Sequence, residues 1–287
     1  MKQTKQTKRV AALSIPPLMR WAGSKRKLLP ELIKHVPDQF TRYIEPFSGS
    51  ACLFFALQPK KAILSDLNRE LMETYRVMSL HPKSVHRAVM AMPVTKRYYY
   101  ELRAELPTSL GRIQRAARFI YLNRHCFNGV YRTNQRGIFN VPRGTRLGAI
   151  PNKDQFQLAA VALRRAKLLA GDFEEVTKYV RRGDFVYLDP PYAKSGARRR
   201  GEYGYASFDI SDVERLATCL NRIDRTGAVF LLSYADCREI RAISSLWHKK
   251  TILVRRHVAG FVKHRAVVRE VLISNQDLKR FKVPTQR

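Results

Sequence analysis

The sequence predicts an α/β protein in which a mainly parallel sheet is interrupted by a long, mainly helical insertion. Short apolar runs typical of buried strands alternate with tight turns and helical segments in the first 66 residues and again after residue 166. Between about residue 68 and residue 166 this strand pattern disappears. Two of the predicted strands are directly followed by, or end in, an aspartate, and open α/β sheets bind their ligands at the carboxyl ends of the strands.

The first part of the chain contains two predicted strands separated by a turn and a helix. An amphipathic helix over 28–36 is ended by Pro37. The segment 43–47 predicts the first strand, 48–51 a turn of small residues, and 52–57 the helix that follows. A second strand over 62–66 ends in Asp66. In this order of elements, an acid after the second strand can bind ribose hydroxyls.

The insertion is predicted from helical periodicity that alternates with a polar, aromatic loop over 123–148. That loop carries five arginines: Arg124, Arg132, Arg136, Arg143 and Arg146. Strands are expected again at 167–169, 185–188, 228–233, 252–255 and 267–274. A loop containing Gly260 joins the last two, which predicts an antiparallel hairpin at the sheet edge.

These elements divide the chain into three expected parts. Residues 1–15, with Lys-Gln-Thr repeated, predict a flexible basic arm. Residues 16–74 and 166–287 would form the sheet domain, and residues 75–165 would form the inserted domain.

The charge of the chain predicts a polyanionic partner. Lys and Arg number 54 against 23 Asp and Glu, which gives a formal net charge of +31. Cations that neutralise phosphates release condensed counterions, so a surplus spread along the whole chain favours nucleic acid. An anionic membrane surface is the competing explanation. It is disfavoured because no apolar run is long enough to span a bilayer and the N-terminus lacks an apolar signal core.

The four cysteines lie far apart without paired CxxC spacing, which argues against a zinc site and against a disulfide scaffold. Cys52 and Cys219 lie in apolar stretches and are expected to be buried, reduced thiols. We therefore expect a cytoplasmic protein without a metal.

The most informative motif is Asp189-Pro190-Pro191-Tyr192, which follows the apolar run 185–188. The two prolines stiffen the turn and leave its carbonyls free to accept hydrogen bonds. A carboxylate, a rigid carbonyl and an aromatic plane together suit a flat exocyclic amine such as that of adenine. The alternative for the tetrapeptide alone is an ordinary loop with a packing tyrosine.

Other motifs are weak individually, but their order along the chain is informative. They are the basic loop 20–25 with its tryptophan, the turn around Gly49, Asp66, the segment 171–173, and the tetrapeptide 189–192. In this order, the chain resembles the Dam-like DNA adenine-N6 methyltransferases from about residue 19 to residue 275. The matching segments are 21–25, 45–50, 66–68, 121–129, 139–142, 189–192 and 270–275.

The resemblance implies a Rossmann-like S-adenosylmethionine-dependent methyltransferase sheet with an inserted, mainly helical DNA-recognition domain. It implies S-adenosylmethionine as methyl donor, with the Lys25 ammonium near its methionine carboxylate, Asp66 on the ribose, and Asp172 and Phe173 on the adenine. The implied cofactor-binding residues are Trp21, Lys25, Phe47, Gly49, Asp66, Asp172, Phe173 and Asp189. The implied catalytic residues are Asp189, Pro190, Pro191 and Tyr192. Because adenine N6 takes part in base pairing, the target base would leave the helix, with Tyr192 stacked on it.

By the same resemblance, double-stranded DNA is the partner and GATC the leading target. Arg132 is the candidate for a bidentate guanine contact, and Asn128 would fill the space beside the orphan thymine. The implied DNA-binding residues are Arg20, Arg124, Asn128, Val130, Arg132 and Pro142. For most of the arginines a phosphate contact is the simpler expectation. The segment 194–207, with Arg198-Arg199-Arg200, predicts a mobile basic loop that could close over the flipped nucleotide, and a solvated, disordered loop is the alternative.

The chain departs from the family pattern at Ala51, where a second glycine is common, and at Phe127 and Val130, where tyrosine and leucine are common. The sequence leaves open a methyltransferase for RNA adenine, cytosine N4 or a protein amide, and a non-catalytic nucleic-acid-binding relative. It also leaves open whether the protein works alone or beside a companion restriction endonuclease.

Overall fold

We describe the fold from a computed structural model, which covers residues 15–134, 136–193, 208–255 and 267–278. Most of the expected basic arm, the whole expected loop over 194–207 and the loop around Gly260 lie outside the described residues. In the part of the chain that the structure covers, every helix is too short or too polar to cross a membrane.

The centre of the described structure is a seven-stranded sheet with the order β3-β2-β1-β4-β5-β7-β6. The first five strands in this order are parallel, whereas β7 runs antiparallel to both β5 and β6. The strands are β1 (Tyr43–Glu45), β2 (Ala62–Asp66), β3 (Ala166–Ala170), β4 (Phe185–Leu188), β5 (Val229–Ala235), β6 (His248–Arg255) and β7 (Val267–Ser274). This confirms the predicted α/β class and the antiparallel hairpin at the edge.

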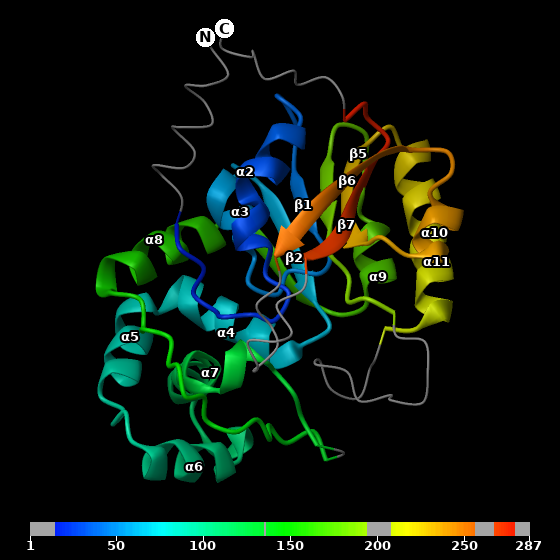
Figure 1. The fold of residues 1–287 in the computed structure, drawn as a ribbon. Coiled ribbons are helices and arrows are strands. Elements are labelled where there is room, and N and C mark those ends of the chain that lie inside the picture. Colours follow the sequence, from blue (N-terminus) through cyan, green and yellow to red (C-terminus); the bar gives the residue numbers. More distant parts are fainter. Residues whose placement is uncertain (1–14, 135, 194–207, 256–266, 279–287) are drawn as a thin grey trace, which may run out of the picture.

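Both faces of the sheet are buried at its central strands β2, β1, β4 and β5, which explains why these strands are largely apolar without alternation. Along β4, Phe185 and Tyr187 belong to one hydrophobic core, and Val186 and Leu188 belong to the other. Figure 1 shows α2 and α3 on one face and α9, α10 and α11 on the other. The helices of the sheet domain are η1 (Lys25–Leu28), α2 (Leu29–Leu32), η2 (Ile33–His35), α3 (Cys52–Leu57), α9 (Phe173–Thr177), α10 (Ile210–Arg225) and α11 (Arg238–Ile243).

The region between β2 and β3 is mainly helical, as predicted, and the described residues between η4 and α8 form a loop that carries two isolated bridges. Its helices are α4 (Arg69–Leu80), α5 (Pro82–Met90), α6 (Lys96–Ala104), η3 (Pro107–Ser109), α7 (Arg112–His125), η4 (Phe127–Gly129) and α8 (Lys153–Leu163). Helices α4, α5, α7 and α8 pack on one another, and α4 also packs on β3. Residue 75, the expected start of the insertion, lies inside α4, so the division into domains stays a prediction.

Three local predictions differ from the structure in detail, and one of them is the strand expected over 252–255, which already starts at His248. The helix expected over 28–36 is a short α-helical turn between two 3-10 segments, and it already starts at Lys25. The first strand ends at Glu45 instead of residue 47, because Pro46 has no N–H for the sheet.

The strand order places four acids together, three of them predicted as site residues. The chain moves outward from β1 through β2 to β3 and then returns to β4 on the other side of β1. Crevices form at such a reversal, beyond the carboxyl ends of the strands. Glu45, Asp66, Asp172 and Asp189 end or follow the four strands β1, β2, β3 and β4 at this edge.

Candidate active site

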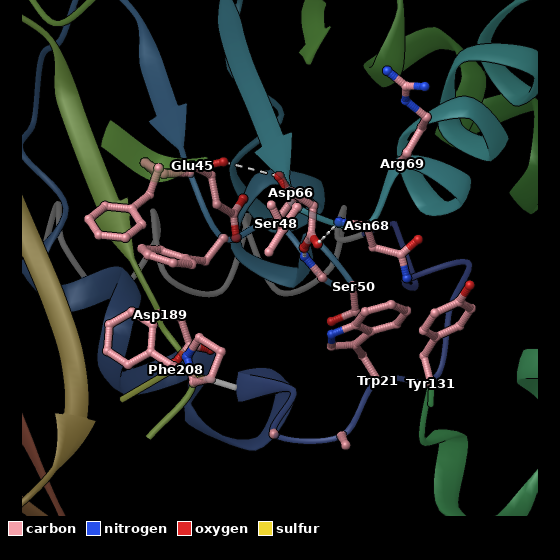
Figure 2. A pocket seen from close by; sticks show the side chains of 18 of the residues that line it. Trp21, Glu45, Ser48, Ser50, Asp66, Asn68, Arg69, Tyr131, Asp189 and Phe208 are labelled. Carbon is pink, nitrogen blue, oxygen red and sulfur yellow. Dashed lines mark hydrogen bonds between the residues drawn. The ribbon is translucent and has the colours of Figure 1, made fainter. Parts of the chain in front are cut away.

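A cavity of about 640 Å³ lies at the carboxyl ends of the strands. All eight residues predicted to bind the cofactor line it, although they come from segments far apart in the sequence: Trp21, Lys25, Phe47, Gly49, Asp66, Asp172, Phe173 and Asp189. Figure 2 shows part of this cavity, with Glu45 and Asp66 at the strand ends and Trp21 beside Tyr131. The sequence motifs therefore converge on one concave site.

The turn after β1 lines the cavity and lets the Trp21 ring approach the backbone closely. Gly49 has a left-handed backbone (φ +44°), and a Cβ atom there would lie 2.7 Å from Cδ1 of Trp21. Its N–H donates to Oδ2 of Asp66 (2.9 Å), while the N–H of Asn68 donates to Oδ1 (2.9 Å). Burial raises the pKa of Asp66, and these two donors oppose the rise. Because a carboxylate accepts about four hydrogen bonds, Asp66 keeps capacity for ligand hydroxyls.

Ala51, where the family pattern often has glycine, also has a left-handed backbone (φ +49°). It is fully buried and does not line the cavity. Its methyl group therefore does not intrude on the cavity. The departure from glycine instead concerns backbone conformation, since non-glycine residues pay a steric cost in this region.

One end of the cavity is an aromatic cluster. The ring of Phe47 lies 5.1 Å from that of Phe173 and 6.2 Å from that of Phe208. Phe208 was missed from the sequence, because nothing in its neighbourhood marks it as part of a site. Such a cluster of apolar, aromatic rings suits a planar ligand ring.

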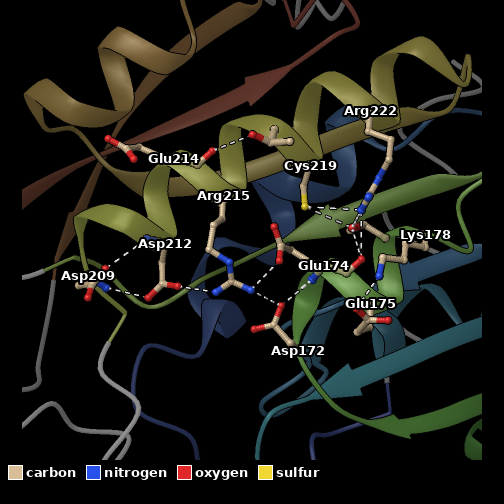
Figure 3. A network of polar contacts seen from close by, with 12 residues as sticks. Asp172, Glu174, Glu175, Lys178, Asp209, Asp212, Glu214, Arg215, Cys219 and Arg222 are labelled. Atoms are coloured by element: carbon tan, nitrogen blue, oxygen red, sulfur yellow. Dashed lines mark hydrogen bonds and ion pairs between the residues drawn. The ribbon is translucent and has the colours of Figure 1, made fainter.

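Asp172, next to this cluster, is held by a cation from α10. The Arg215 guanidinium donates to Asp172 (2.6 Å), Glu174 (2.9 Å) and Asp212 (2.7 Å), as Figure 3 shows. It also lies 4.8 Å from the centroid of the Phe173 ring. The three carboxylates raise the pKa of Arg215. Arg215 was likewise not predicted, since only the fold brings α10 to the end of β3.

Asp189 follows β4 and pairs with Lys25. The Lys25 Nζ lies 2.6 Å from Oδ1 of Asp189, and the Ser233 hydroxyl donates to the same oxygen at 3.0 Å. Burial disfavours the Lys25 ammonium, but Asp189, Tyr192 and Glu270 together outweigh burial and raise the pKa of Lys25. Burial also raises the pKa of Asp189, against the effect of Lys25. Lys25, predicted to lie beside a cofactor carboxylate, thus contacts the predicted catalytic acid.

The remaining residues of the tetrapeptide differ in their relation to the cavity, and Tyr192 does not line it. Pro191 lines the cavity, whereas Pro190 is buried behind it. The centroid of the Tyr192 ring lies 5.0 Å from that of Tyr234. The Lys25 Nζ lies 5.4 Å from the centroid of the Tyr192 ring. A base brought to Asp189 would therefore meet an aromatic ring close by.

Glu45 is a further acid in the cavity wall. It is almost fully buried, accepts a hydrogen bond from the Tyr43 hydroxyl (3.0 Å), and lines the cavity. Burial raises the pKa of Glu45 well above its ordinary value. Its place at the carboxyl end of a strand was a signal that could have identified it.

The segment 126–143 doubles back on itself and carries four of the six residues predicted to bind DNA: Asn128, Val130, Arg132 and Pro142. Cys126 bridges to Arg143 and Thr133 to Phe139. Arg132 is exposed, and its Nε donates to Asn140 (3.0 Å). The segment thus presents an exposed arginine and an exposed proline on one loop.

The other two predicted DNA-binding residues, Arg20 and Arg124, have structural contacts in this structure. The Arg124 guanidinium donates to the carbonyls of Pro17 and Leu18, both at 2.7 Å. Burial lowers the pKa of Arg124 to about 10, aided by the nearby Arg20. Arg20 donates to the carbonyls of Arg124 and Arg146, both at 3.1 Å. None of the six predicted DNA-binding residues lines the cavity.

This geometry agrees with the comparisons with known proteins. The family described as D12 class N6 adenine-specific DNA methyltransferase matches residues 21–258. The chain belongs to this family. It is therefore an adenine-specific DNA methyltransferase, which decides among the substrates that the sequence left open in favour of DNA adenine.

The alignments with named relatives cover most of each relative and most of this chain. A type II methyltransferase of Lactococcus lactis subsp. cremoris, M1.LlaDCHI, is 31% identical over 273 residues, 92% of this chain and 96% of that protein. A type II methyltransferase of Methanocaldococcus jannaschii, M.MjaIII, is 34% identical over 245 residues, 77% of this chain and 84% of that protein. The DNA adenine methylase of Serratia marcescens is 30% identical over 264 residues, 88% of this chain and 96% of that protein.

Proposed function

We propose that this DNA adenine methyltransferase takes its methyl group from S-adenosylmethionine and transfers it to N6 of an adenine flipped out of duplex DNA, with GATC as the leading target. The observation that carries the proposal is the position of Asp189. It lies in the wall of a cavity whose other residues suit an adenosine derivative, and it pairs with a buried cation that also lies 5.4 Å from the centroid of the Tyr192 ring.

The residues present fit S-adenosylmethionine. Asp66 would accept from the ribose hydroxyls, and Gly49, which lines the cavity, leaves room for the Trp21 ring against the backbone. Phe47, Phe173 and Phe208 would enclose the adenine, with Asp172 accepting from its amine. Trp21 would contact the methionine part. When bound, the cofactor supplies a methyl group activated by a sulfonium.

Asp189 and the Pro190 carbonyl would activate the target amine. The N6 lone pair of adenine is delocalised into the ring, so the amine is a weak nucleophile. Two acceptors on its N–H groups favour a pyramidal nitrogen and localise that pair, and they stabilise the charge that develops on N6. Among the described residues, the hydrogen-bonding partners of Asp189 fall on Oδ1, which leaves Oδ2 for the amine. The methylated amine then loses a proton to solvent.

Lys25 would set the charge of the catalytic acid. Its ammonium lies 2.6 Å from Oδ1 of Asp189 in a buried setting, and this contact favours the ionised carboxylate. An ionised acid accepts from the amine and does not compete with it as a donor. We propose this role for Lys25 in place of a contact with the cofactor's carboxylate.

Target recognition is proposed for the doubled-back segment 126–143 together with Arg20. Flipping the base costs roughly a few kcal/mol, which stacking on Tyr192 would partly offset. Arg132 would read a guanine, with Asn128, Val130 and Pro142 close to the bases. The partner we propose is double-stranded DNA; a companion restriction endonuclease is not part of the proposal. The four free thiols support a cytoplasmic setting.

The test is methyl transfer from labelled S-adenosylmethionine to unmethylated genomic DNA, followed by base-resolution mapping of N6-methyladenine. We expect methylation confined to one short motif, which would then confirm or replace GATC. Intact cofactor binding without methylation of any DNA would contradict the proposal.

A further inference from the structure

Tyr131 belongs to the proposed DNA-recognition segment and also lines the proposed cofactor site. In the sequence it lies between Val130 and Arg132, both proposed to contact bases. In the structure its ring stacks on Trp21, with the centroids 6.1 Å apart and the planes at 15°. Both rings line the cavity (Figure 2). The recognition segment therefore supplies part of the wall of the proposed cofactor site.

Trp21 is in turn locked to the turn that would bind the cofactor. Its indole ring occupies the space beside Gly49 that a side chain would need, at 2.7 Å from an added Cβ. Gly49 also donates to Asp66. A ligand that contacts Gly49 or Asp66 therefore lies next to Trp21, and the Trp21 ring stacks on Tyr131.

Tyr131 is held on its other sides, so it cannot turn independently of the recognition segment. Its ring packs against Phe119 (5.4 Å) and Phe139 (5.5 Å), and its hydroxyl donates to Oε2 of Glu70 (2.8 Å). Burial raises the pKa of Tyr131, which keeps the hydroxyl a donor.

Glu70 extends the connection to the ribose loop and the helical region. It lies in the first turn of α4, directly after the segment 66–68. The guanidinium of Arg118, which is almost fully buried, lies 3.5 Å from its Oε1 and donates to the carbonyls of Leu102 and Arg103. Glu70 thus joins the α4 end of the cavity to α6 and α7.

We propose that Tyr131 couples occupancy of the cofactor site to recognition of the target sequence. The proposal rests on the proposed function, because it assumes the cofactor site and the base contacts of Val130 and Arg132. A cofactor that fixes Trp21 fixes the Tyr131 ring and so removes freedom from the two flanking residues before DNA arrives. Ordering one site in advance lowers the cost of binding at the other, and the coupling is reciprocal.

The experiment uses fluorescence anisotropy to measure how binding of one ligand changes the affinity of the protein for the other. Its probes are S-adenosylhomocysteine, which cannot donate a methyl group, and a duplex carrying one copy of the motif that the methylation map returns. For the unsubstituted protein we expect S-adenosylhomocysteine to raise affinity for this duplex about tenfold, equivalent to about 1.4 kcal/mol. By linkage, the duplex raises affinity for S-adenosylhomocysteine by the same factor.

Two variants separate the contacts of Tyr131. In Tyr131→Leu, which removes the stack on Trp21, we expect the coupling factor to fall below about twofold. Tyr131→Phe keeps the stack and loses the bond to Glu70, so it should retain an intermediate factor. Tyr98→Leu is the matched control: it removes another half-buried tyrosine of the helical region that packs on Tyr121 and lies away from the cavity. It should leave the factor unchanged.

A general loss of stability would weaken the affinities without selectively removing their coupling. Tyr131→Leu with the full factor of the unsubstituted protein, or an unsubstituted protein with a factor of one, would overturn the inference while turnover remains intact. Failure to bind S-adenosylhomocysteine or to methylate DNA would instead contradict the proposed function.

Discussion

At the residue scale, the carboxylates of the cavity differ in what holds them. Asp66 accepts from two backbone N–H groups, Asp172 is paired with Arg215, and Asp189 with Lys25. Backbone N–H donors position a carboxylate oxygen without neutralising its charge, whereas a cation positions the carboxylate and also neutralises it. This difference predicts distinct effects on cofactor binding and on turnover.

Replacing Asp189 with asparagine should lower the methylation rate at least about 10²-fold, because the neutral amide is a weaker acceptor and can donate instead. Cofactor and DNA affinities should stay within a few fold. Single-turnover methylation and the two binding constants test this, with Asp154→Asn as an exposed acidic control. An active Asp189→Asn protein would remove the carboxylate from the mechanism.

Arg215→Ala should weaken cofactor binding roughly tenfold and leave kcat at saturating cofactor nearly unchanged, because it loosens Asp172 and not Asp189. The measurement is the KM for S-adenosylmethionine against kcat. Arg225→Ala, an exposed arginine in the last turn of the same helix, is the control. A lower kcat with an unchanged KM would show that Arg215 acts on the reaction itself.

At the scale of elements, the end of α7 is held by a buried histidine among cations. His125 ends this helix, and its ring lies 4.3 Å from that of Tyr121. Burial lowers the pKa of His125 to about 4, and Arg143, Arg124 and Arg20 act in the same direction. Since the loop over 126–143 starts here, protonation would destabilise the proposed recognition segment.

The pKa of His125 in the folded protein lies below its ordinary value of 6.5, so the unfolded chain binds the proton first as pH falls. His125 therefore favours folding fully above about pH 6.5 and loses this contribution toward pH 4. We expect the free energy of unfolding to fall by about 2 kcal/mol more, between pH 7 and pH 5, in the unsubstituted protein than in His125→Gln. Urea unfolding at both pH values measures the difference. Equal pH dependence in the two proteins would contradict the assignment.

At the scale of the whole molecule, the net charge of +31 governs DNA affinity more than any single contact. Each neutralised phosphate adds to the salt dependence of binding, whatever the base sequence. Specificity must then come from a few side chains at base edges. The two contributions are separable by experiment.

For the unsubstituted protein we expect DNA affinity to fall by about 10³–10⁵-fold between 50 and 200 mM salt, the range for six to ten phosphate contacts. Arg132→Ala should relax the preference at one base pair, at a cost of roughly 1–3 kcal/mol for the cognate site. Arg136→Ala, an exposed arginine on the same loop, should instead reduce the salt slope by about one and weaken all sequences alike. A uniform loss for Arg132→Ala would show that Arg132 only contacts phosphate.

The sequence by itself determined the fold class and most strands, because both depend on local patterns. The buried run 185–188 and the aspartates that end or follow the strands were recognisable from neighbouring residues alone. The ordered motifs also indicated the family, which the comparison with known proteins then confirmed. Strand boundaries, such as the end of β1 at Glu45, depended on which backbone N–H groups were able to form hydrogen bonds in the sheet.

Only the tertiary structure decided which of these residues meet. The Lys25–Asp189 pair, the stack of Trp21 on Tyr131 and the approach of Arg215 to Asp172 each join segments far apart in the chain. No periodicity or spacing encodes such contacts, because they depend on how the strands order in the sheet and which helices cover each face. Phe208 was missed for the same reason: it becomes part of the cavity only when the start of α10 packs against Phe47 and Phe173.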